Sequence, residues 1–280
     1  MTETVAVIGV GAMGSALLER LRLARKNVRI YDIAESARAA AAAAGAEVAG
    51  SPADAARGAS NIHVFVRTDE EVYAAVLGQN GVLTGATAGA VLMLHSTTLP
   101  QTTRLVADAA TEKGVRVLDI PITSVPARVR KGEAAFLVGG PDALVTEVRG
   151  YLEAIGGVVY HFGPLGSGNI AKLAKNAMNA VERVMFSEML RMAVAAGLDA
   201  RRFLEMLSAE HHGSVVSDWE KAVTLKDHGP AMRPVTNLLN KDLPLAAEYA
   251  RTINLDLPVT RQAAEEGQIL LEAWTRSWKA

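Results

Sequence analysis

The 280-residue chain is half hydrophobic, carries a formal net charge of −1 and contains no cysteine. The length suits one large or two ordinary domains, and the near-neutral charge gives no general attraction for nucleic acid or anionic membranes. Without cysteine, disulfides, thiolate nucleophiles and thiolate-bound metals are excluded. The first residues lack a signal peptide's basic start and apolar stretch, and no apolar run approaches about 20 residues. We therefore expect a soluble cytoplasmic protein.

Short apolar runs alternate with helical patterns as far as residue 162. Several of the runs are continuous in Val, Ile and Leu, as expected for strands that helices cover on both faces. This alternation predicts an α/β fold with a doubly wound, mostly parallel sheet of the Rossmann type. The predicted strands are residues 5–9, 28–32, 62–66, 91–95, 115–120, 134–139 and 158–162.

The pattern changes after the glycine-rich stretch 163–168, where the strands stop. We expect a dinucleotide-binding domain over residues 1–163 and an all-helical domain over residues 164–280. The first predicted helix of the second part is unusually long, which is typical of a spine or a subunit interface. The predicted helices are residues 170–196, 200–207, 237–251 and 259–278, and the apolar stripe of the first includes Met178, Met185 and Met189.

The first predicted strand leads directly into "GVGAMG", which places Gly9, Gly11 and Gly14 between a strand and a helix. The first glycine makes the turn, the second lets backbone approach a pyrophosphate, and the third allows close helix–strand packing. The second strand ends at Asp32, whose carboxylate can accept hydrogen bonds from a ribose diol and would repel a 2′-phosphate. The sequence therefore predicts a dinucleotide site that prefers NAD. NADP is not excluded, because Arg38 follows closely.

Five motifs give nearly the whole chain a resemblance to the β-hydroxyacid dehydrogenase family, which includes 3-hydroxyisobutyrate dehydrogenases and tartronate semialdehyde reductases. "GVGAMG" is similar to that family's Gly-x-Gly-x-Met-Gly, and "HSTTLP" to its segment beside the nicotinamide. "DIPIT" resembles the start of its substrate motif, "GSGNIAKLAKN" its catalytic stretch, and "NKDLPLA" its Lys-Asp-Leu element. The resemblance implies a Rossmann domain followed by a helical domain, a small-molecule substrate and a homodimer or homotetramer.

The resemblance also assigns roles to individual residues. It implies that Lys172 is the catalytic lysine and that Asn176 binds the substrate. Thr123 and Ser124 are the further substrate-binding candidates, and Lys241 can contact either substrate or cofactor. The implied cofactor-binding residues are Gly9, Gly11, Ala12, Met13, Gly14, Asp32, Ser96, Thr97 and Lys241.

Lys172 and Asn176 are four residues apart, so on a helix they project from the same side. Hydride transfer between a nicotinamide and a carbonyl needs a proton for the developing alkoxide, which a lysine can give during reduction and take during oxidation. Burial would lower the pKa of Lys172, and the Asn176 amide can hold a substrate oxygen. With Asn179 and Arg183, however, these residues also form a polar stripe that fits a solvated helix face.

The substrate motif departs from the family pattern. Thr123-Ser124-Val125 stands in place of Ser-Gly-Gly, and the added side chains restrict the approach of backbone amides to a substrate carboxylate. "PARVRK" over residues 126–131 adds three cations, which either bind an acidic substrate group or form a solvated loop. Lys175 adds a further positive charge close to Lys172.

Three functions remain open from the sequence. The first is an NAD(P)-dependent dehydrogenase or reductase of a small 3-hydroxy acid or semialdehyde; the others are a reductase of a bulkier carbonyl or an imine, and a noncatalytic NAD(H)-binding protein. No metal is expected, because His63, His95 and His161 lie on or beside strands as packed polar residues and no ligand spacing occurs. Nucleic acid and membranes are not expected partners.

Overall fold

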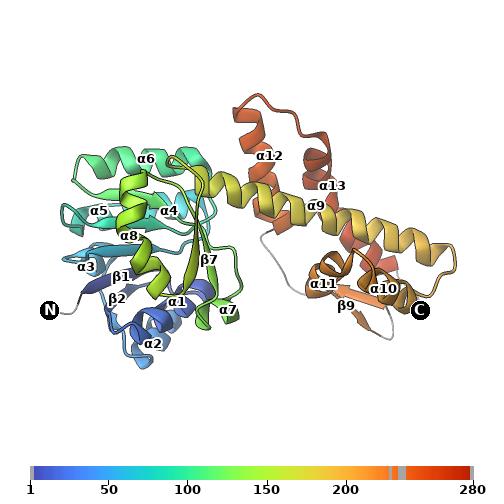
Figure 1. The fold of residues 1–280 in the computed structure, drawn as a ribbon, viewed down its shortest axis with the longest axis horizontal. Helices are drawn as coiled ribbons and strands as arrows, with labels where there is room; N and C mark the ends of the chain where they lie inside the picture. Colours follow the sequence, from blue (N-terminus) through green and yellow to red (C-terminus); the bar gives the residue numbers. More distant parts are fainter. Residues whose placement is uncertain (1–2, 227–228, 233–237, 278–280) are drawn as a thin grey trace. The chain divides into compact units, whose positions relative to one another are not determined.

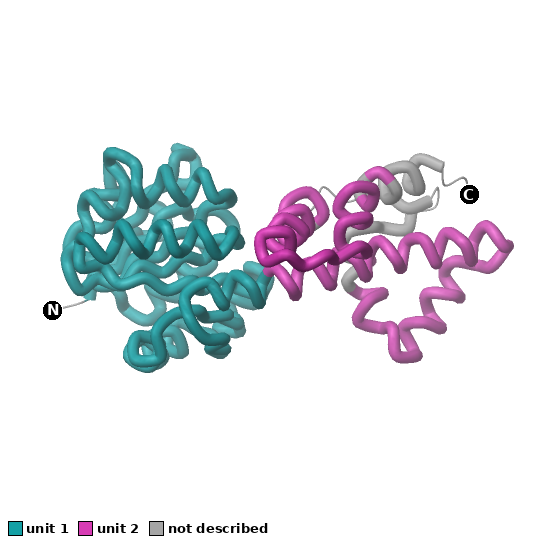
Figure 2. Tube along the Cα trace, turned by 90° about the horizontal axis from the view of Figure 1, so that it is seen from above, with its two compact units in different colours: residues 1–172 teal, residues 173–280 magenta. Residues whose placement is uncertain are grey.

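The computed structural model describes residues 3–226, 229–232 and 238–277. The chain forms two compact units, residues 1–172 and 173–280, which Figure 2 distinguishes by colour. The division falls within the long helix that the sequence predicts after the glycine-rich stretch. In the described part of the chain, no helix combines the length and the apolar character that a membrane span requires.

The first unit is built on a six-stranded parallel sheet with helices on both faces (Figure 1). The strand order is β3-β2-β1-β4-β5-β6, and each neighbouring pair is parallel. The order reverses between β1 and β4, as in dinucleotide-binding folds, which confirms the predicted fold class. The strands are β1 (Thr4–Ile8), β2 (Asn27–Tyr31), β3 (Glu47–Val48), β4 (Asn61–Val64), β5 (Val91–Leu94) and β6 (Arg116–Asp119).

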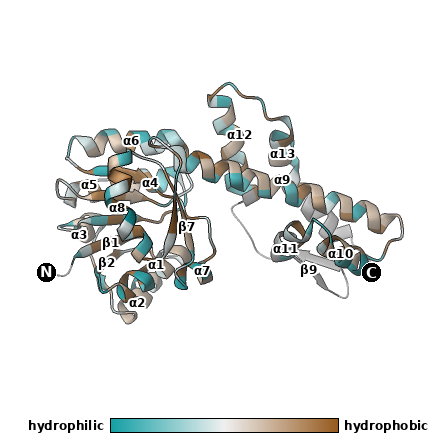
Figure 3. Ribbon diagram, viewed as in Figure 1, coloured by the Kyte–Doolittle hydropathy of each residue, from teal (hydrophilic) through white to brown (hydrophobic). Residues whose placement is uncertain are grey.

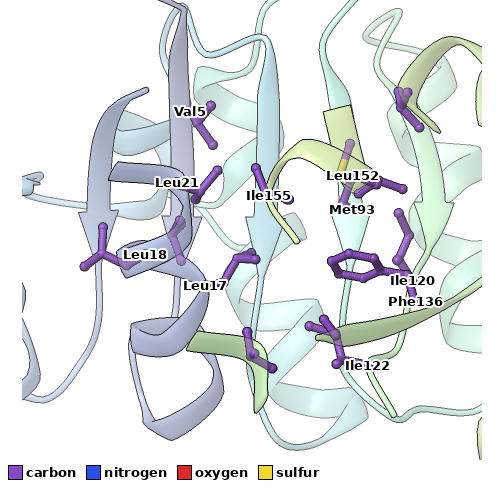
Figure 4. Packing of buried hydrophobic residues seen from close by; sticks show 14 of the residues in the cluster. Val5, Leu17, Leu18, Leu21, Met93, Ile120, Ile122, Phe136, Leu152 and Ile155 are labelled. Atoms are coloured by element: carbon purple, nitrogen blue, oxygen red, sulfur yellow. The ribbon is translucent and has the colours of Figure 1, made fainter. Parts of the chain in front are cut away.

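Apolar side chains on both faces of the strands build two separate cores. Along β1, Val5 and Val7 belong to one core while Ala6 and Ile8 belong to the other, as strand alternation requires. Figure 4 shows the first core, where Leu17 and its neighbours on α1 pack against the sheet. The strands are correspondingly among the most hydrophobic segments in Figure 3. Burial on both faces explains the continuous apolar runs of the sequence.

Local sequence explains where helices of the first unit begin. At α3, Ser51 Oγ accepts a hydrogen bond of 3.1 Å from the Asp54 amide, and Pro52 is the first helical residue, so a capping side chain and a proline define the start of the helix. The helices are α1 (Ala12–Leu23), α2 (Glu35–Ala43), α3 (Pro52–Ala56), α4 (Asp69–Leu77), α5 (Val82–Gly85), α6 (Pro100–Thr111), α7 (Pro126–Arg130) and α8 (Asp142–Ala154).

The last two predicted strands pair with each other instead of continuing the parallel sheet. β7 (Ala134–Val138) and β8 (Gly157–His161) are parallel, and α8 connects them. β7 meets the end of β6 through two antiparallel bridges, Asp119↔Gly139 and Ile122↔Phe136. The two-residue β3 was not predicted, because so short a strand shows no alternation.

The second unit is helical, as predicted, with one addition. The pair β9 (Val223–Lys226) and β10 (Gly229–Met232) is antiparallel, so the second part is not entirely helical. The two segments, Val-Thr-Leu-Lys and Gly-Pro-Ala-Met, are too short to show the alternation that would predict a strand. The helices are α9 (Ser167–Ala195), which begins in the first unit, α10 (Ala200–Ala209), α11 (Gly213–Ala222), the π-helical turn η1 (Leu238–Asp242), α12 (Leu243–Thr252) and α13 (Pro258–Ser277).

Two buried histidines and a tyrosine form a hydrogen-bonded chain in the first core. His63 Nδ1 lies 2.8 Å from His95 Nε2, and His63 Nε2 lies 2.7 Å from the Tyr151 hydroxyl. Burial lowers the pKa of His63 to about 3, and burial together with the neighbouring His63 holds the pKa of His95 well below its ordinary value. Both histidines are therefore neutral at pH 7, as packed polar residues.

The buried histidines should make the fold sensitive to acid. Unfolded histidines bind protons below about pH 6.5, whereas folded His63 does so only near pH 3, so the unfolded state binds more protons between these values. We expect the free energy of unfolding to fall as the pH decreases from about 7 to about 5. Each histidine contributes up to about 1.4 kcal/mol per pH unit.

Urea unfolding at several pH values, followed by far-UV circular dichroism, measures this dependence. Tryptophan fluorescence is unsuitable, because all three tryptophans follow residue 172. The double variant His63→Gln/His95→Gln should show a flatter pH dependence than the wild type. A wild-type free energy of unfolding that stays constant over this range would contradict the prediction.

Candidate functional site

The glycine-rich loop joins β1 to α1 at the point where the strand order reverses. Gly9 has a φ of +86°, and a Cβ there would lie 2.1 Å from the Phe65 carbonyl oxygen, while a Cβ at Gly14 would lie 2.0 Å from the Gly9 carbonyl oxygen. Apart from Gly11 itself and its two chain neighbours, no atom lies within 4 Å of a Cβ placed on Gly11. The first and third glycines thus allow close packing, and the second leaves an open face. A pyrophosphate can approach the backbone amides at the start of α1 from this face.

A cavity of about 630 Å³ lies beside the loop, entirely within the first unit. Its wall combines the loop with the ends of β2 and β4, which is where doubly wound sheets hold nucleotides. Sequence reasoning missed the contribution of β4, although residues directly after a strand beside the point of reversal are the expected lining. The cavity-lining residues used below are Gly9, Gly11, Asp32, Phe65 and Val66.

Asp32 lines this cavity and also supports the glycine-rich loop. Its Oδ2 accepts a hydrogen bond of 2.8 Å from the Val10 amide, and its Oδ1 accepts one of 2.8 Å from the Ala34 amide. Each carboxylate oxygen retains capacity for another hydrogen bond. The Arg38 guanidinium donates to the carbonyls of Asp32 and Ile33, at 2.7 and 3.0 Å, so Arg38 braces the backbone of the β2–α2 turn.

Ser96 and Thr97, the expected nicotinamide segment, follow β5. The buried Ser96 hydroxyl donates to the Val66 carbonyl at 2.8 Å and accepts from the Val66 amide at 3.3 Å. Ser96 therefore ties the end of β5 to the end of β4, directly behind the cavity wall. Thr97 is half-buried at the next position.

Asp119, at the end of β6, fastens the start of α9. Its Oδ1 accepts a hydrogen bond of 2.7 Å from the Gly166 amide, and its Oδ2 accepts one of 2.7 Å from the Asn169 amide. Burial raises the pKa of Asp119, and these backbone hydrogen bonds partly offset the rise. Gly168 packs so closely that a Cβ would lie 2.3 Å from the Leu137 carbonyl oxygen. The glycines of this stretch thus let α9 begin directly against the sheet.

Lys172 lies in the second turn of α9 and is half-buried. Its Nζ donates a hydrogen bond of 2.7 Å to the Ile122 carbonyl, one residue before Thr123. The structure therefore brings the catalytic candidate to the segment that carries the substrate-binding candidates. Ser124 Oγ lies 3.4 Å from the Glu133 carbonyl oxygen, a weak contact across the same loop.

Two of the three cations after this segment, Arg128 and Arg130, have carboxylate partners. Arg128 on α7 pairs with Glu133 at 3.1 Å, and Arg130 pairs with Glu19 of α1 at 2.8 Å, both in exposed positions. These ion pairs favour the solvated interpretation of the loop over an acidic-substrate site. Across residues 3–226, 229–232 and 238–277, no group of three His, Asp or Glu side chains is placed to hold a metal ion.

In the second unit, Asn176, Lys241 and Asp242 lie together. Asn176 Nδ2 donates to Asp242 Oδ2 at 2.8 Å, and Lys241 Nζ donates to Asp242 Oδ1 at 3.4 Å. Asp242 is buried, so it fixes the orientation of the Asn176 amide. Lys241 and Asp242 belong to the π-helical turn η1, a geometry that recurs at functional sites.

The polar stripe on α9 is not a uniformly solvated face. Asn176 and Arg183 have exposed fractions of only 4% and 6%. Lys175, by contrast, is exposed, and its Nζ lies 2.9 Å from the Asn179 amide oxygen when that amide is oriented to match its neighbours. Burial of amide and guanidinium groups is unusual for a purely solvated stripe and indicates a more specific use of this face.

Comparison with known proteins covers nearly the whole chain. Residues 4–163 match the family model of the NAD-binding domain of 6-phosphogluconate dehydrogenase, and residues 166–278 match that described as NAD-binding of NADP-dependent 3-hydroxyisobutyrate dehydrogenase. An NAD-dependent L-serine dehydrogenase of Pseudomonas aeruginosa is 30% identical, with 96% of this chain and 93% of the relative covered. A 3-hydroxyisobutyrate dehydrogenase of the same organism is 29% identical, with 92% and 89% covered.

A solved structure agrees with these matches. The 3-hydroxyisobutyrate dehydrogenase of Mycobacterium tuberculosis with L-serine has a TM-score of 0.82 and 25% identity, with 98% of this chain and 96% of that chain covered. The matched families indicate a nicotinamide cofactor, and the open face of Gly11 beside the cavity fits its pyrophosphate. The chain therefore belongs to the β-hydroxyacid dehydrogenase family and is an NAD(P)-dependent oxidoreductase that acts on a CH–OH group.

Proposed function

We propose that the chain transfers a hydride between NAD(H) and a small 3-hydroxy acid or its semialdehyde, with Lys172 as general acid and base. The observation that carries this proposal is the 2.7 Å hydrogen bond from Lys172 Nζ to the Ile122 carbonyl. It holds the amine beside the segment leading to Thr123, on a helix whose start Asp119 anchors. An amine so held can protonate the alkoxide during reduction and accept that proton during oxidation.

The other candidates have distinct tasks in this proposal. The bound nicotinamide supplies or accepts the hydride. Asn176, oriented by Asp242, holds a substrate oxygen, and Lys241 contributes positive charge beside it. The first turn of α1 holds the pyrophosphate with backbone amides. The proposed cofactor contacts are Gly9, Gly11, Ala12, Met13, Gly14, Asp32, Ser96, Thr97 and Lys241.

L-serine and 3-hydroxyisobutyrate are the first substrates to test. Relatives of this chain are named for both, and both are short acids with a hydroxyl group on the third carbon. Thr123 and Ser124 supply hydroxyl groups where the family pattern has Ser-Gly. We propose that these hydroxyls help to bind the substrate carboxylate and narrow the range of substrates that fit.

The preferred cofactor in this proposal is NAD(H). Asp32 lies in the cavity wall at the end of β2, where a carboxylate favours a free ribose diol over a 2′-phosphate. Arg38 lies close by but is hydrogen-bonded to backbone carbonyls. Its engagement there supports the preference for NAD(H).

We further propose that the chain forms a homodimer or homotetramer through α9. The helix carries four exposed methionines, Met178, Met185, Met189 and Met192. Spacings of seven, four and three residues place them along one side of a helix. Exposed apolar stripes of this kind are typical of association surfaces.

Removing the Lys172 amine should abolish most turnover but leave the cofactor site intact. We expect Lys172→Ala to lower kcat by about 10²–10⁴ with L-serine or 3-hydroxyisobutyrate, while NADH affinity stays nearly unchanged. Steady-state kinetics with NADH absorbance and NADH titration measure the two effects. Lys175→Ala is the matched control, because this exposed lysine lies on the same helix. Near-normal turnover of Lys172→Ala would remove Lys172 from the mechanism.

Cofactor preference should depend on the charge of Asp32. Asp32→Asn keeps one oxygen able to accept from the Val10 amide but removes the negative charge. We expect the ratio of kcat/KM for NADPH to that for NADH to rise by about tenfold or more. Glu35→Gln, which neutralises an exposed carboxylate in the first turn of α2, should leave the ratio unchanged. A wild type that uses NADPH as well as NADH would disprove the preference.

Charge placed on the methionine stripe should weaken association. We expect the wild type to sediment as a dimer or tetramer at micromolar concentration and Met185→Lys/Met189→Lys to shift it toward monomer, because the charges must be desolvated. Arg191→Glu, which changes the charge at an exposed position on another side of α9, is the control for altered charge. A monomeric wild type would refute the proposed association.

A further inference from the structure

The hydrogen bonds that link the buried residues Tyr151, His63 and His95 have a single direction. The Ile120 carbonyl can only accept, so His95 Nδ1, 2.8 Å away, carries a proton. Because neutral imidazole has one N–H, His95 Nε2 must accept from His63 Nδ1, and His63 Nε2 must accept from the Tyr151 hydroxyl. The chain therefore runs as Tyr151 to His63 to His95 to Ile120, with every donor and acceptor satisfied.

Tyr151, at the outer end of this hydrogen-bonded chain, keeps its hydroxyl proton. Burial, together with the charge of Glu3, raises the pKa of Tyr151 well above its ordinary value, so the hydroxyl remains a donor. The Lys26 ammonium lies 5.3 Å from the centre of the Tyr151 ring and pairs with Glu3. These contacts hold the tyrosine of α8 in place.

The inner end of the chain lies against the cavity wall. The His95 ring stacks on Phe65 with a centroid distance of 4.2 Å and an interplanar angle of 1°. Phe65 and Val66 line the cavity, and Ser96, the residue after His95, is hydrogen-bonded to Val66. Movement of His95 would therefore displace both the ring and the segment that carries Ser96.

The strand order indicates which end of a bound dinucleotide a movement of His95 would affect. Asp32, for the adenosine ribose, follows β2, the glycine-rich loop follows β1, and Phe65 and Ser96 follow β4 and β5. A dinucleotide whose adenosine lies at β2 and whose pyrophosphate lies at β1 places its nicotinamide on the β4–β5 side. The hydrogen-bonded chain of Tyr151, His63 and His95 therefore contacts the residues expected at the nicotinamide end of the dinucleotide.

We propose that Tyr151, His63 and His95 are positioning residues that hold Phe65 and the Ser96–Thr97 segment in place for the nicotinamide of the bound dinucleotide. The inference rests on the proposed function, in which Ser96 and Thr97 lie beside the nicotinamide. None of the three polar side chains donates to the cofactor. They act by setting the distance between the ends of β4, β5 and β6, because a buried polar chain with all partners satisfied is stiff.

Binding of two nucleotides separates this role from general stability. NADH occupies both ends of the site, whereas ADP lacks the nicotinamide and its ribose. We expect His63→Leu, which breaks the middle of the chain, to weaken NADH binding by about 5- to 50-fold, and Tyr151→Phe, which removes only the outer donor, by about 2- to 5-fold. ADP binding should change by less than about twofold in both. Tyr160→Phe, which removes an exposed phenol of β8, is the matched control.

A second measurement needs no variant. Long-range ¹⁵N–¹H correlation spectra of the wild type distinguish the two imidazole tautomers, and both buried histidines should be protonated at Nδ1 and not at Nε2. A proton on Nε2 of either histidine would overturn the proposed direction. Equal loss of ADP and NADH affinity, or unchanged NADH affinity in His63→Leu, would overturn the positioning role. Because these readouts need no turnover, an inactive wild type would count against the proposed function alone.

Discussion

The position of Lys172 depends on one buried carboxylate. Asp119 ends β6 and accepts hydrogen bonds from the amides of Gly166 and Asn169, which are the otherwise unpaired donors at the start of a helix. A buried carboxylate without such partners would be strongly unfavourable. Since α9 is continuous, fastening its start to the sheet also fixes where Lys172 emerges. Glycine is required at position 168 because a Cβ there would collide with the backbone at the ends of β7 and β6.

Several side chains of the candidate site also support the fold around it. Asp32 holds the glycine-rich loop through the Val10 amide while lining the cavity, so a change at Asp32 would alter both the cavity wall and the support of the loop. Ser96 likewise joins two strand ends at the position expected to face the nicotinamide. In the second unit, Asp242 orients Asn176 in a similar way. Buried polar groups need partners, and here the partners also position the side chains of the site.

Local patterns in the sequence predicted most of the fold. Continuous apolar runs marked the strands because helices cover both sheet faces, and the glycine spacing marked the β1–α1 turn. The short β3, helix α11 and the β9–β10 pair were missed because brief segments carry too little periodicity. The sequence also left undecided whether Arg128 and Arg130 form ion pairs, since the partner of an exposed cation depends on which element packs beside it.

The sequence by itself determined the order of strands and helices along the chain and the position of the glycine-rich turn. It also determined the four-residue spacing that puts Lys172 and Asn176 on one side of a helix. These are local properties, set by periods of two and 3.6 residues. Only the tertiary structure decided which distant groups meet. His63 is 32 residues from His95 and 88 from Tyr151, and Asp119 is 47 residues from Gly166. The order of the strands across the sheet brings such groups together, and this order cannot be read from the spacing of residues along the chain.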